Sequence, residues 1–201
     1  MNVAIIDYGA GNVPSVERAL QKLGATPERV NSAEKLATAR AIILPGVGHY
    51  AALIRALDQR GLRECLVDAI MQRKPFLGIC LGLQALYQSS EEAPNLAGLG
   101  ILRGKICALP ETVKLPHMGW NRLKMRRESA LLEGLNENEY FYFAHTFAAR
   151  AANEETVASC EYGTEFGAVI EMGRMCAVQF HPEKSGAAGA KLLANFLRNA
   201  S

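Results

Sequence analysis

The sequence predicts an α/β protein with a mostly parallel open sheet flanked by helices, followed by a more antiparallel, β-rich C-terminal region. Up to residue 90, short apolar runs alternate with segments of helical period, which is typical of parallel strands joined by crossover helices. From Ile101 onward, short β-rich runs separated by turn residues indicate antiparallel strands. The segment Ala187–Asn199 then returns to a helical period.

Three parallel strands are expected in the N-terminal part, at Val3–Ile6, Ala41–Leu44 and Phe76–Ile79. Each is a short uncharged run of the kind that lies buried inside a parallel sheet. Helices are expected beside them, because apolar residues recur there at intervals of three and four. These residues are Val13, Val16, Leu20 and Leu23 in the first helix, Tyr50, Leu53, Ile54 and Leu57 in the second, and Leu62, Leu66, Ala69 and Ile70 in the third.

Both ends of the first helix are marked in the sequence. Asn12 is a suitable N-cap, and Pro14 is tolerated in the first turn, where its missing N–H costs no hydrogen bond. Gly24 is a suitable residue to end the helix.

The C-terminal region is expected to contain short strands and one closing helix. The expected strands are Lys105–Leu109, Tyr140–His145, Thr156–Glu161, Ala168–Glu171 and Met175–Phe180. The helix over Ala187–Asn199 is amphipathic, and its inward face is expected to carry Leu192, Leu193, Phe196 and Leu197. Because no linker or internal repeat interrupts the chain, we expect residues 1–201 to form a single domain.

Composition excludes several classes of protein and gives little information about partners. Hydrophobic residues make up 49% and charged residues 21% of the 201 residues, which excludes disordered, collagen-like and coiled-coil chains. Lys and Arg number 22 against 20 Asp and Glu, so the net charge of +2 gives no reason to expect nucleic acid or an anionic membrane.

The sequence favours a cytoplasmic location. The uncharged stretches Ala41–Ile54 and Pro75–Ser90 are too short, and too often interrupted by Pro, Gly, His or Gln, to predict a transmembrane helix. The N-terminus has no basic lead of a secretory signal before its first apolar run. The five cysteines are widely spaced with no C-x-x-C pair, which fits a reducing compartment and predicts no metal site.

The strongest local pattern is Gly78-Ile79-Cys80-Leu81-Gly82, which follows an expected strand and precedes a helical segment. This is the pattern of a nucleophile elbow, in which flanking glycines allow a strained turn and the central side chain projects from the carboxyl end of the sheet. The N-terminus of the following helix would also favour a thiolate. A lone cysteine is more often a small buried residue, but strand, glycines and helix together favour Cys80 as a nucleophile.

A cysteine nucleophile needs a base, and His181 is the best placed of the four histidines. It directly follows an expected strand, Pro182 stiffens the turn, and Glu183 can orient the imidazole. Taken alone, a histidine at this position is more often a loop residue at the end of a strand. Its combination with the elbow favours covalent acyl transfer by Cys80, His181 and Glu183.

Two glycine-containing turns follow other expected strands. The turn Leu44-Pro45-Gly46-Val47-Gly48 can aim backbone N–H groups at an oxyanion, or can simply be a turn between strand and helix. The run Asp7-Tyr8-Gly9-Ala10-Gly11-Asn12 is similar to the opening of a dinucleotide fingerprint, but Pro14 stands where the third glycine belongs. Nucleotide binding is therefore disfavoured.

On these motifs the sequence resembles the class I (triad) glutamine amidotransferases over nearly its whole length, and among them the glutaminase subunits of imidazole glycerol phosphate synthases. The class-level motifs are the elbow, extended to Gln84, and His181-Pro182-Glu183. Further matching blocks are Asp7-Tyr8-Gly9-x-Gly11-Asn12, Pro45-Gly46-Val47-Gly48-His49, Pro116-His117-Met118-Gly119-Trp120-Asn121, Phe143-Ala144-His145-Thr146 and His181-Pro182-Glu183-Lys184-Ser185. The resemblance implies a flavodoxin-like fold.

The resemblance also implies a reaction and a partner. Cys80 attacks the carboxamide of glutamine, His181 passes the proton to the departing ammonia, and Glu183 holds His181. Water then hydrolyses the glutamyl thioester. The ammonia passes to a (β/α)₈-barrel cyclase partner, with which the chain forms a heterodimer that makes imidazole glycerol phosphate and aminoimidazole carboxamide ribonucleotide in histidine biosynthesis. No metal or organic cofactor is implied.

Further residues receive roles by the same resemblance. The oxyanion hole is implied to use the N–H of Leu81 and one from Val47 or Gly48, after that loop reorients. The implied glutamine pocket contains Gln84, His145 and Thr146. The implied partner interface contains Asn12, Trp120 and Lys184, with Trp120 in a loop that runs from Pro116 to Asn121. The chain departs from the usual family pattern at Ala144, where Val is common, at Phe147, where the hydroxyl of a common Tyr is absent, and at Val13-Pro14 beside the interface.

Three other functions remain open at this stage. A subunit of aminobenzoate or anthranilate synthesis would share the triad, although the block around Trp120 argues against it. A catalytically idle regulatory subunit would keep the fold without glutamine turnover. A free-standing cysteine hydrolase would be fully active without a partner.

Overall fold

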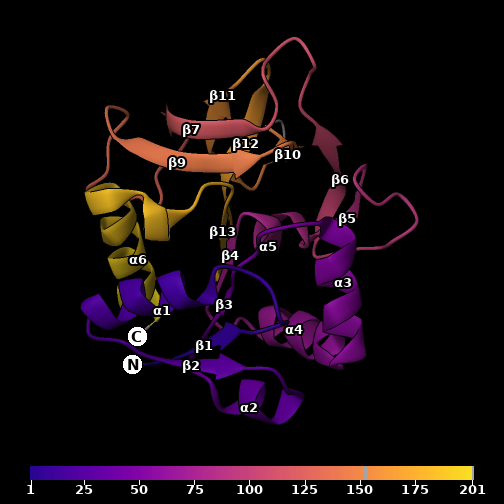
Figure 1. Cartoon of the computed structure of the whole chain (residues 1–201). Coiled ribbons are helices and arrows are strands. Elements are labelled where there is room, and N and C mark those ends of the chain that lie inside the picture. The colour runs from indigo at the N-terminus through magenta and orange to yellow at the C-terminus, as the bar shows by residue number, and fades with distance from the viewer. Residues whose placement is uncertain (152–153, 201) are drawn as a thin grey trace.

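The computed structural model describes residues 1–151 and 154–200. Within them an 11-stranded sheet runs through the molecule (Figure 1). Nine of its strands follow the order β2-β1-β3-β4-β13-β12-β10-β6-β5, and the other two branch from it, β11 beside β12 and β8 beside β11. The N-terminal elements are β1 Asn2–Ile6, α1 Val13–Lys22, β2 Thr26–Val30, α2 Ala33–Thr38, β3 Ala41–Leu44, α3 Tyr50–Gln59, α4 Leu62–Met71, β4 Phe76–Ile79, α5 Leu81–Gln84 and β5 Tyr87–Ser90. The later elements are β6 Leu102–Ala108, β7 His117–Arg122, β8 Lys124–Met125, β9 Tyr140–His145, β10 Phe147–Arg150, β11 Thr156–Glu161, β12 Glu165–Met172, β13 Met175–Val178, the 3₁₀ turn η1 Pro182–Lys184 and α6 Gly186–Ala200.

The sheet is parallel on one side and mainly antiparallel on the other, as the sequence predicts. Strands β2, β1, β3, β4 and β13 pair in parallel. Strand β12 pairs antiparallel with β13, β10 and β11, and β10 pairs antiparallel with β6. Strands β7 and β9 form a separate antiparallel pair at the top of Figure 1.

Alternation along β1 divides the core between the two faces of the sheet. Val3 and Ile5 pack in one apolar cluster with the inner faces of α1 and α6. Ala4 and Ile6 pack in the other cluster with α2, α3 and α4. Side chains of a strand point alternately to opposite faces, and the buried strands β3, β4 and β13 likewise contribute to both clusters.

The sequence misses a strand and a helix between the first two predicted strands. Strand β2 pairs with β1 at the edge of the sheet, and only Val30 of its five residues is buried. An edge strand of this composition has no apolar run for a pattern to detect. The short helix α2 follows it and buries Leu36.

The structure confirms the helix predicted after Cys80, as a short one, and corrects one further expectation. The helix after Cys80 has only four residues and leads directly into β5. The block from Pro116 to Asn121, which the resemblance treats as a loop, lies mostly in the strand β7, which pairs with β9. No helix within residues 1–151 and 154–200 combines the length and apolar character needed to cross a membrane.

Candidate active site

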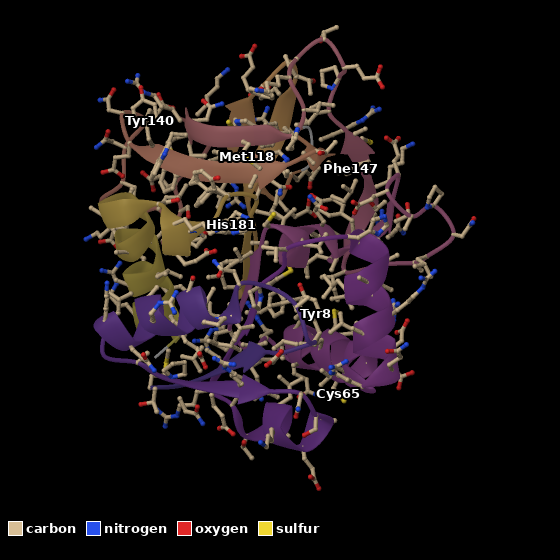
Figure 2. All side chains as sticks on the ribbon, in the orientation of Figure 1. Tyr8, Cys65, Met118, Tyr140, Phe147 and His181 are labelled. Atoms are coloured by element: carbon tan, nitrogen blue, oxygen red, sulfur yellow. The ribbon has the colours of Figure 1, made fainter. Side chains whose placement is uncertain are left out.

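The loops that carry the predicted site follow four neighbouring parallel strands at their carboxyl ends. Tyr8 follows β1, the turn around Val47 follows β3, Cys80 follows β4, and His181 follows β13. Because these strands lie side by side in the order β1-β3-β4-β13, the segments after them meet at one edge of the sheet. In the view of Figure 2, His181 lies between the small β7–β9 sheet and the N-terminal half of the chain.

Cys80 has the strained backbone that an elbow requires, with φ of 52° and ψ of −105°. Its flanking glycines are needed for close approach of the backbone. A Cβ atom at Gly82 would lie 1.9 Å from the Leu44 carbonyl oxygen, and one at Gly78 would lie 2.8 Å from the Gly82 oxygen. The predicted elbow is therefore present, although a helix of one turn contributes less dipole at the sulfur than the sequence suggests.

His181 is held between Cys80 and Glu183. Its Nδ1 lies 2.9 Å from Glu183 Oε1, and the side chains of His181 and Glu183 are only 2% and 1% exposed. Burial by itself would lower the pKa of His181, but hydrogen bonds to Cys80 and Glu183 raise it to about 10. The structure thus brings Cys80, His181 and Glu183 into one hydrogen-bonded array.

Asn12 supports this array from α1. It stands at the N-cap position, but its side chain makes no capping bond. Instead its Nδ2 donates to Glu183 Oε1 at 3.2 Å. Asn12 therefore stands at the predicted N-cap position, and the side-chain hydrogen bond that it makes is to Glu183 rather than to the helix terminus.

Two of the predicted oxyanion donors, the N–H groups of Leu81 and Val47, have other acceptors in this conformation. The Leu81 N–H donates to the Gly46 carbonyl at 3.4 Å. The Val47 N–H donates to the Tyr8 hydroxyl at 3.3 Å, and burial raises the pKa of Tyr8 to about 12, so the hydroxyl stays neutral. Gly48 has φ of 97°, which favours glycine at this turn.

Cys80 and His181 open into a cavity of about 230 Å³. Its lining contains the predicted residues Val47, Gly48, Leu81, Gln84, His145, Thr146 and Lys184, together with Glu92, Pro116, Met118, Ala144 and Phe147. Gln84 and His145 are buried and hydrogen-bonded to the Phe147 carbonyl, at 2.8 and 2.9 Å. Burial lowers the pKa of His145 to about 3, so its ring is neutral at pH 7.

A strip of exposed apolar side chains lies on β7 and β9, beside this cavity. Met118, Trp120 and Tyr140 are 64%, 55% and 47% exposed. The Trp120 ring packs edge-on against Tyr142, and Lys184 Nζ lies 5.7 Å from the centre of the Tyr142 ring. We refer to Met118, Trp120 and Tyr140 as the β7–β9 strip.

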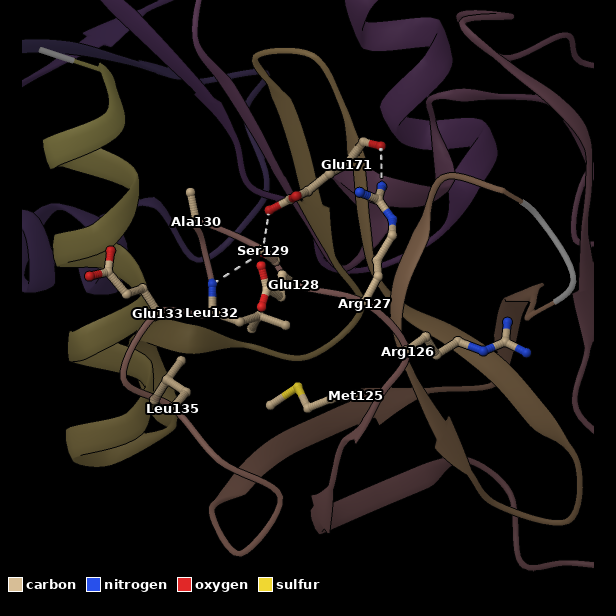
Figure 3. Close-up of a pocket in the computed structure, with 10 residues that line it drawn as sticks. All are labelled: Met125, Arg126, Arg127, Glu128, Ser129, Ala130, Leu132, Glu133, Leu135 and Glu171. Atoms are coloured by element: carbon tan, nitrogen blue, oxygen red, sulfur yellow. Dashed lines mark hydrogen bonds between the residues drawn. The ribbon is translucent and has the colours of Figure 1, made fainter.

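A second hollow, of about 790 Å³, contains none of the predicted site residues (Figure 3). It is lined in part by Arg126, Arg127, Ser129 and Glu171, and Arg127 donates to the Glu171 carbonyl within it. In the described ranges 1–151 and 154–200, no group of three or more His, Cys, Asp or Glu side chains is arranged to hold a metal ion.

Three residues that contact the site were not predicted as functional. Gln179 Nε2 lies 3.6 Å from Cys80 Sγ, Tyr8 contacts Val47, and Glu92 lines the cavity. Tyr8 lies inside a quoted motif block, and Gln179 lies in the expected strand Met175–Phe180, two residues before His181. Glu92 lies in a segment without any motif, so the sequence offers no signal for it.

Comparison with known proteins agrees with the fold and the site. The family model described as glutamine amidotransferase class-I matches residues 4–200. The imidazole glycerol phosphate synthase subunit HisH of Methanothermobacter thermautotrophicus is 47% identical over 195 residues, covering 97% of each chain. The HisH subunit of Aquifex aeolicus is 43% identical over 202 residues, covering 100% of this chain and 98% of the relative.

Solved structures show the same fold at lower sequence identity. A crystal structure of a glutamine amidotransferase superposes with a TM-score of 0.79 at 21% identity and covers 98% of both chains. The structure of PurLQS from Thermotoga maritima gives a TM-score of 0.78 at 21% identity, with 100% of this chain and 99% of that chain covered. The chain belongs to the class I glutamine amidotransferases, and within them to the HisH glutaminase subunits of imidazole glycerol phosphate synthase in histidine biosynthesis.

Proposed function

We propose that Cys80, His181 and Glu183 form the catalytic triad that hydrolyses glutamine. The observation that carries this proposal is the buried hydrogen-bonded array at the mouth of the cavity. The Cys80 thiolate attacks the carboxamide carbon, and protonated His181 gives its proton to the leaving nitrogen, which departs as ammonia. His181 then takes a proton from water, the resulting hydroxide attacks the glutamyl thioester, and glutamate leaves as the Cys80 sulfur is released.

Glu183 and Asn12 keep the imidazole in place through both steps. The carboxylate accepts from Nδ1 of His181 and from the Asn12 amide, so Nε2 of the ring is the nitrogen left to exchange protons with sulfur and substrate. In this proposal the carboxylate stabilises the imidazolium and does not itself take up the proton.

The oxyanion of each tetrahedral intermediate would be held by Leu81 and by Val47 or Gly48 after a change of the turn. The Leu81 and Val47 N–H groups have other acceptors in the structure, the Gly46 carbonyl and the Tyr8 hydroxyl. Rotation of the peptides after Pro45 would release both donors toward the cavity. The resting chain would then be a slow glutaminase.

Glutamine would lie in the cavity with its α-carbon end toward charged groups. Glu92 and Lys184 line the cavity and carry the opposite charges that an amino acid zwitterion needs. Thr146 adds a hydroxyl at the same wall. Gln84 and His145 would act mainly by holding the Phe147 carbonyl and the wall around it.

The partner in this proposal is a (β/α)₈-barrel cyclase subunit, which receives the ammonia in a heterodimer. The β7–β9 strip supports it, because contiguous exposed aromatic and Met side chains are typical of protein interfaces. Trp120, Lys184 and Asn12 would lie at or near that interface. Neither a cofactor nor a metal has a step in the reaction, and a single domain over residues 1–201 and a cytoplasmic location remain predictions.

The test measures glutamate release from glutamine by the purified chain, alone and with a barrel subunit loaded with its ribonucleotide acceptor. We expect a low rate alone, a rise of orders of magnitude with the loaded partner, and no activity in Cys80→Ala. Full activity without a partner would indicate a free-standing hydrolase. Glutamine turnover by Cys80→Ala, or none by the native chain in either state, would refute the triad.

A further inference from the structure

A series of buried hydrogen bonds reaches the Cys80 sulfur independently of His181 and Glu183. Gln179 Nε2 lies 3.6 Å from Cys80 Sγ, and Gln179 Oε1 lies 3.3 Å from Gln84 Nε2. Gln84 Nε2 also donates to the Phe147 carbonyl at 2.8 Å. Gln179 has no exposed surface and Gln84 is 3% exposed, so water does not compete for these groups.

The direction of these bonds is set by the Phe147 carbonyl, which can only accept. His145 Nδ1 and the Gln84 amide nitrogen both face this oxygen, and both must therefore donate to it. The amide nitrogen of Gln84 then also donates to Gln179 Oε1. Because the Gln179 oxygen accepts from Gln84, the NH₂ group of Gln179 is the end that faces the Cys80 sulfur.

The far end of the series is consistent with this direction. Burial lowers the pKa of His117 to about 4 and that of His145 to about 3, so each neutral ring carries one proton. Because the His145 proton is on Nδ1, its Nε2 accepts from His117 Nδ1, which lies 3.1 Å away. His117 Nε2 is then free to accept from the Asn121 amide at 3.5 Å. No donor faces a donor along the whole series.

We propose that Gln179 is a further catalytic residue, whose amide donates a hydrogen bond to the Cys80 sulfur and stabilises its thiolate. The inference rests on the proposed role of Cys80 as the nucleophile. A charged sulfur accepts hydrogen bonds more strongly than a neutral thiol, so a buried donor favours the anion. His181 is also hydrogen-bonded to Cys80. Tyr8 is the other titratable group near the sulfur, and its hydroxyl bonds to the Val47 N–H. The Ala144 carbonyl lies 4.0 Å from the sulfur, where it can accept from the thiol but cannot donate to the thiolate.

The test is the pH dependence of Cys80 alkylation by iodoacetamide, followed by intact mass in the native chain and in Gln179→Met. Methionine keeps the length of the side chain and removes the donor. We expect the midpoint of the alkylation profile to move up by about 1 to 2 pH units, the size expected for a hydrogen bond to a charged group. Asn195→Leu is the matched control, because it likewise replaces a buried amide by an apolar side chain of similar length. The Asn195 amide donates to the backbone carbonyls of Leu131 and Glu133, so its loss should leave the midpoint of Cys80 alkylation unchanged.

A second measurement needs no variant at Gln179 that must fold. The side-chain amide resonances of Gln179, followed by NMR in the native chain, should shift with the same midpoint as alkylation, and should not titrate in Cys80→Ala. An unmoved midpoint in folded Gln179→Met, or amide resonances that ignore the titration of Cys80, would overturn the role of Gln179. If Cys80 alkylation leaves glutamine turnover intact, the proposed triad fails instead.

Discussion

The Tyr8 hydroxyl is the clearest case of a single residue that opposes the proposed reaction in the resting chain. It accepts the Val47 N–H, which is one of the donors proposed for the oxyanion. The hydroxyl is buried, so water does not replace it when the turn moves. Release of Val47 toward the cavity therefore costs one hydrogen bond, worth about 0.5–1.5 kcal/mol.

Tyr8→Phe is expected to raise the glutaminase rate of the isolated chain by roughly 2- to 10-fold, because the Val47 N–H loses its resting acceptor. Steady-state glutamate release without a partner is the measurement. Tyr50→Phe is the matched control, since the Tyr50 hydroxyl is buried without a hydrogen-bond partner among the described residues. An unchanged or lower rate in folded Tyr8→Phe would show that the turn is held by other contacts.

Strands β7 and β9 bring two buried histidines together at the element scale. His117 stacks against Phe143 and Tyr162 with ring centres 4.8 and 4.0 Å apart, and its Nδ1 meets His145 across the strand pair. The pairing of His117 directly opposite His145 in the antiparallel register produces this contact. Protonation of either ring would place a charge among aromatic side chains, which the fold disfavours.

The two buried histidines predict that the folded protein loses stability in mild acid, at pH values above those at which carboxylates titrate. The folded pKa values of about 4 and about 3 lie below the ordinary value of 6.5, so the unfolded chain binds more protons and stability falls as pH falls below 6.5. We expect the unfolding free energy to decrease between pH 6.5 and 5 by up to about 1.4 kcal/mol per pH unit for each histidine. The raised pKa of His181 acts in the other direction, since its contribution is complete below pH 6.5 and is lost toward pH 10.

Urea unfolding at a series of pH values checks this expectation. His117→Gln should flatten the acid slope by removing one of the two groups, even if it lowers stability at pH 7. His49→Gln is the control, because its side chain is exposed. If the unfolding free energy of the native chain and of His117→Gln fell equally steeply with pH, His117 would not be a neutral buried group in the folded state.

At the scale of the whole molecule, the proposed reaction and the proposed partner surface occupy the same end. The carboxyl ends of β1, β3, β4 and β13 carry the site, and the β7–β9 sheet lies above them in Figure 1. Met118 belongs both to the cavity lining and to the β7–β9 strip. A partner seated on the strip would therefore lie next to the point at which ammonia forms.

Trp120→Ala is expected to weaken binding of the cyclase partner by about 30-fold or more, as truncation of a central interface aromatic costs about 2 kcal/mol. Calorimetry of the two subunits measures the change, and the single tryptophan of this chain gives an independent fluorescence signal in the native protein. Met71→Ala on α4 is the control for an exposed apolar residue, being 65% exposed outside the strip. Equal affinities for native and Trp120→Ala chains would exclude the strip as the main contact.

The sequence predicts those parts of the fold that depend on neighbouring residues. Buried parallel strands such as Ala41–Leu44, the helix Val13–Lys22 and the antiparallel strand Tyr140–His145 are all confirmed. Their periodicity is a local property of burial on one or two faces. Strands β2 and β7 are among those missed, because charged or polar residues, Pro and Gly interrupt their sequences, TPERV and HMGWNR, and leave no apolar run for a pattern to detect.

The sequence by itself determined the elbow, because the strain at Cys80 and the small neighbours it requires are encoded within a few residues. Only the tertiary structure decided which distant residues contact the residues of the site. Asn12 meets Glu183 across 171 positions, Tyr8 meets Val47 across 39, and Gln179 meets Cys80 across 99. These contacts depend on the order in which the strands assemble, and a periodic pattern carries no information about which distant loops that order brings together.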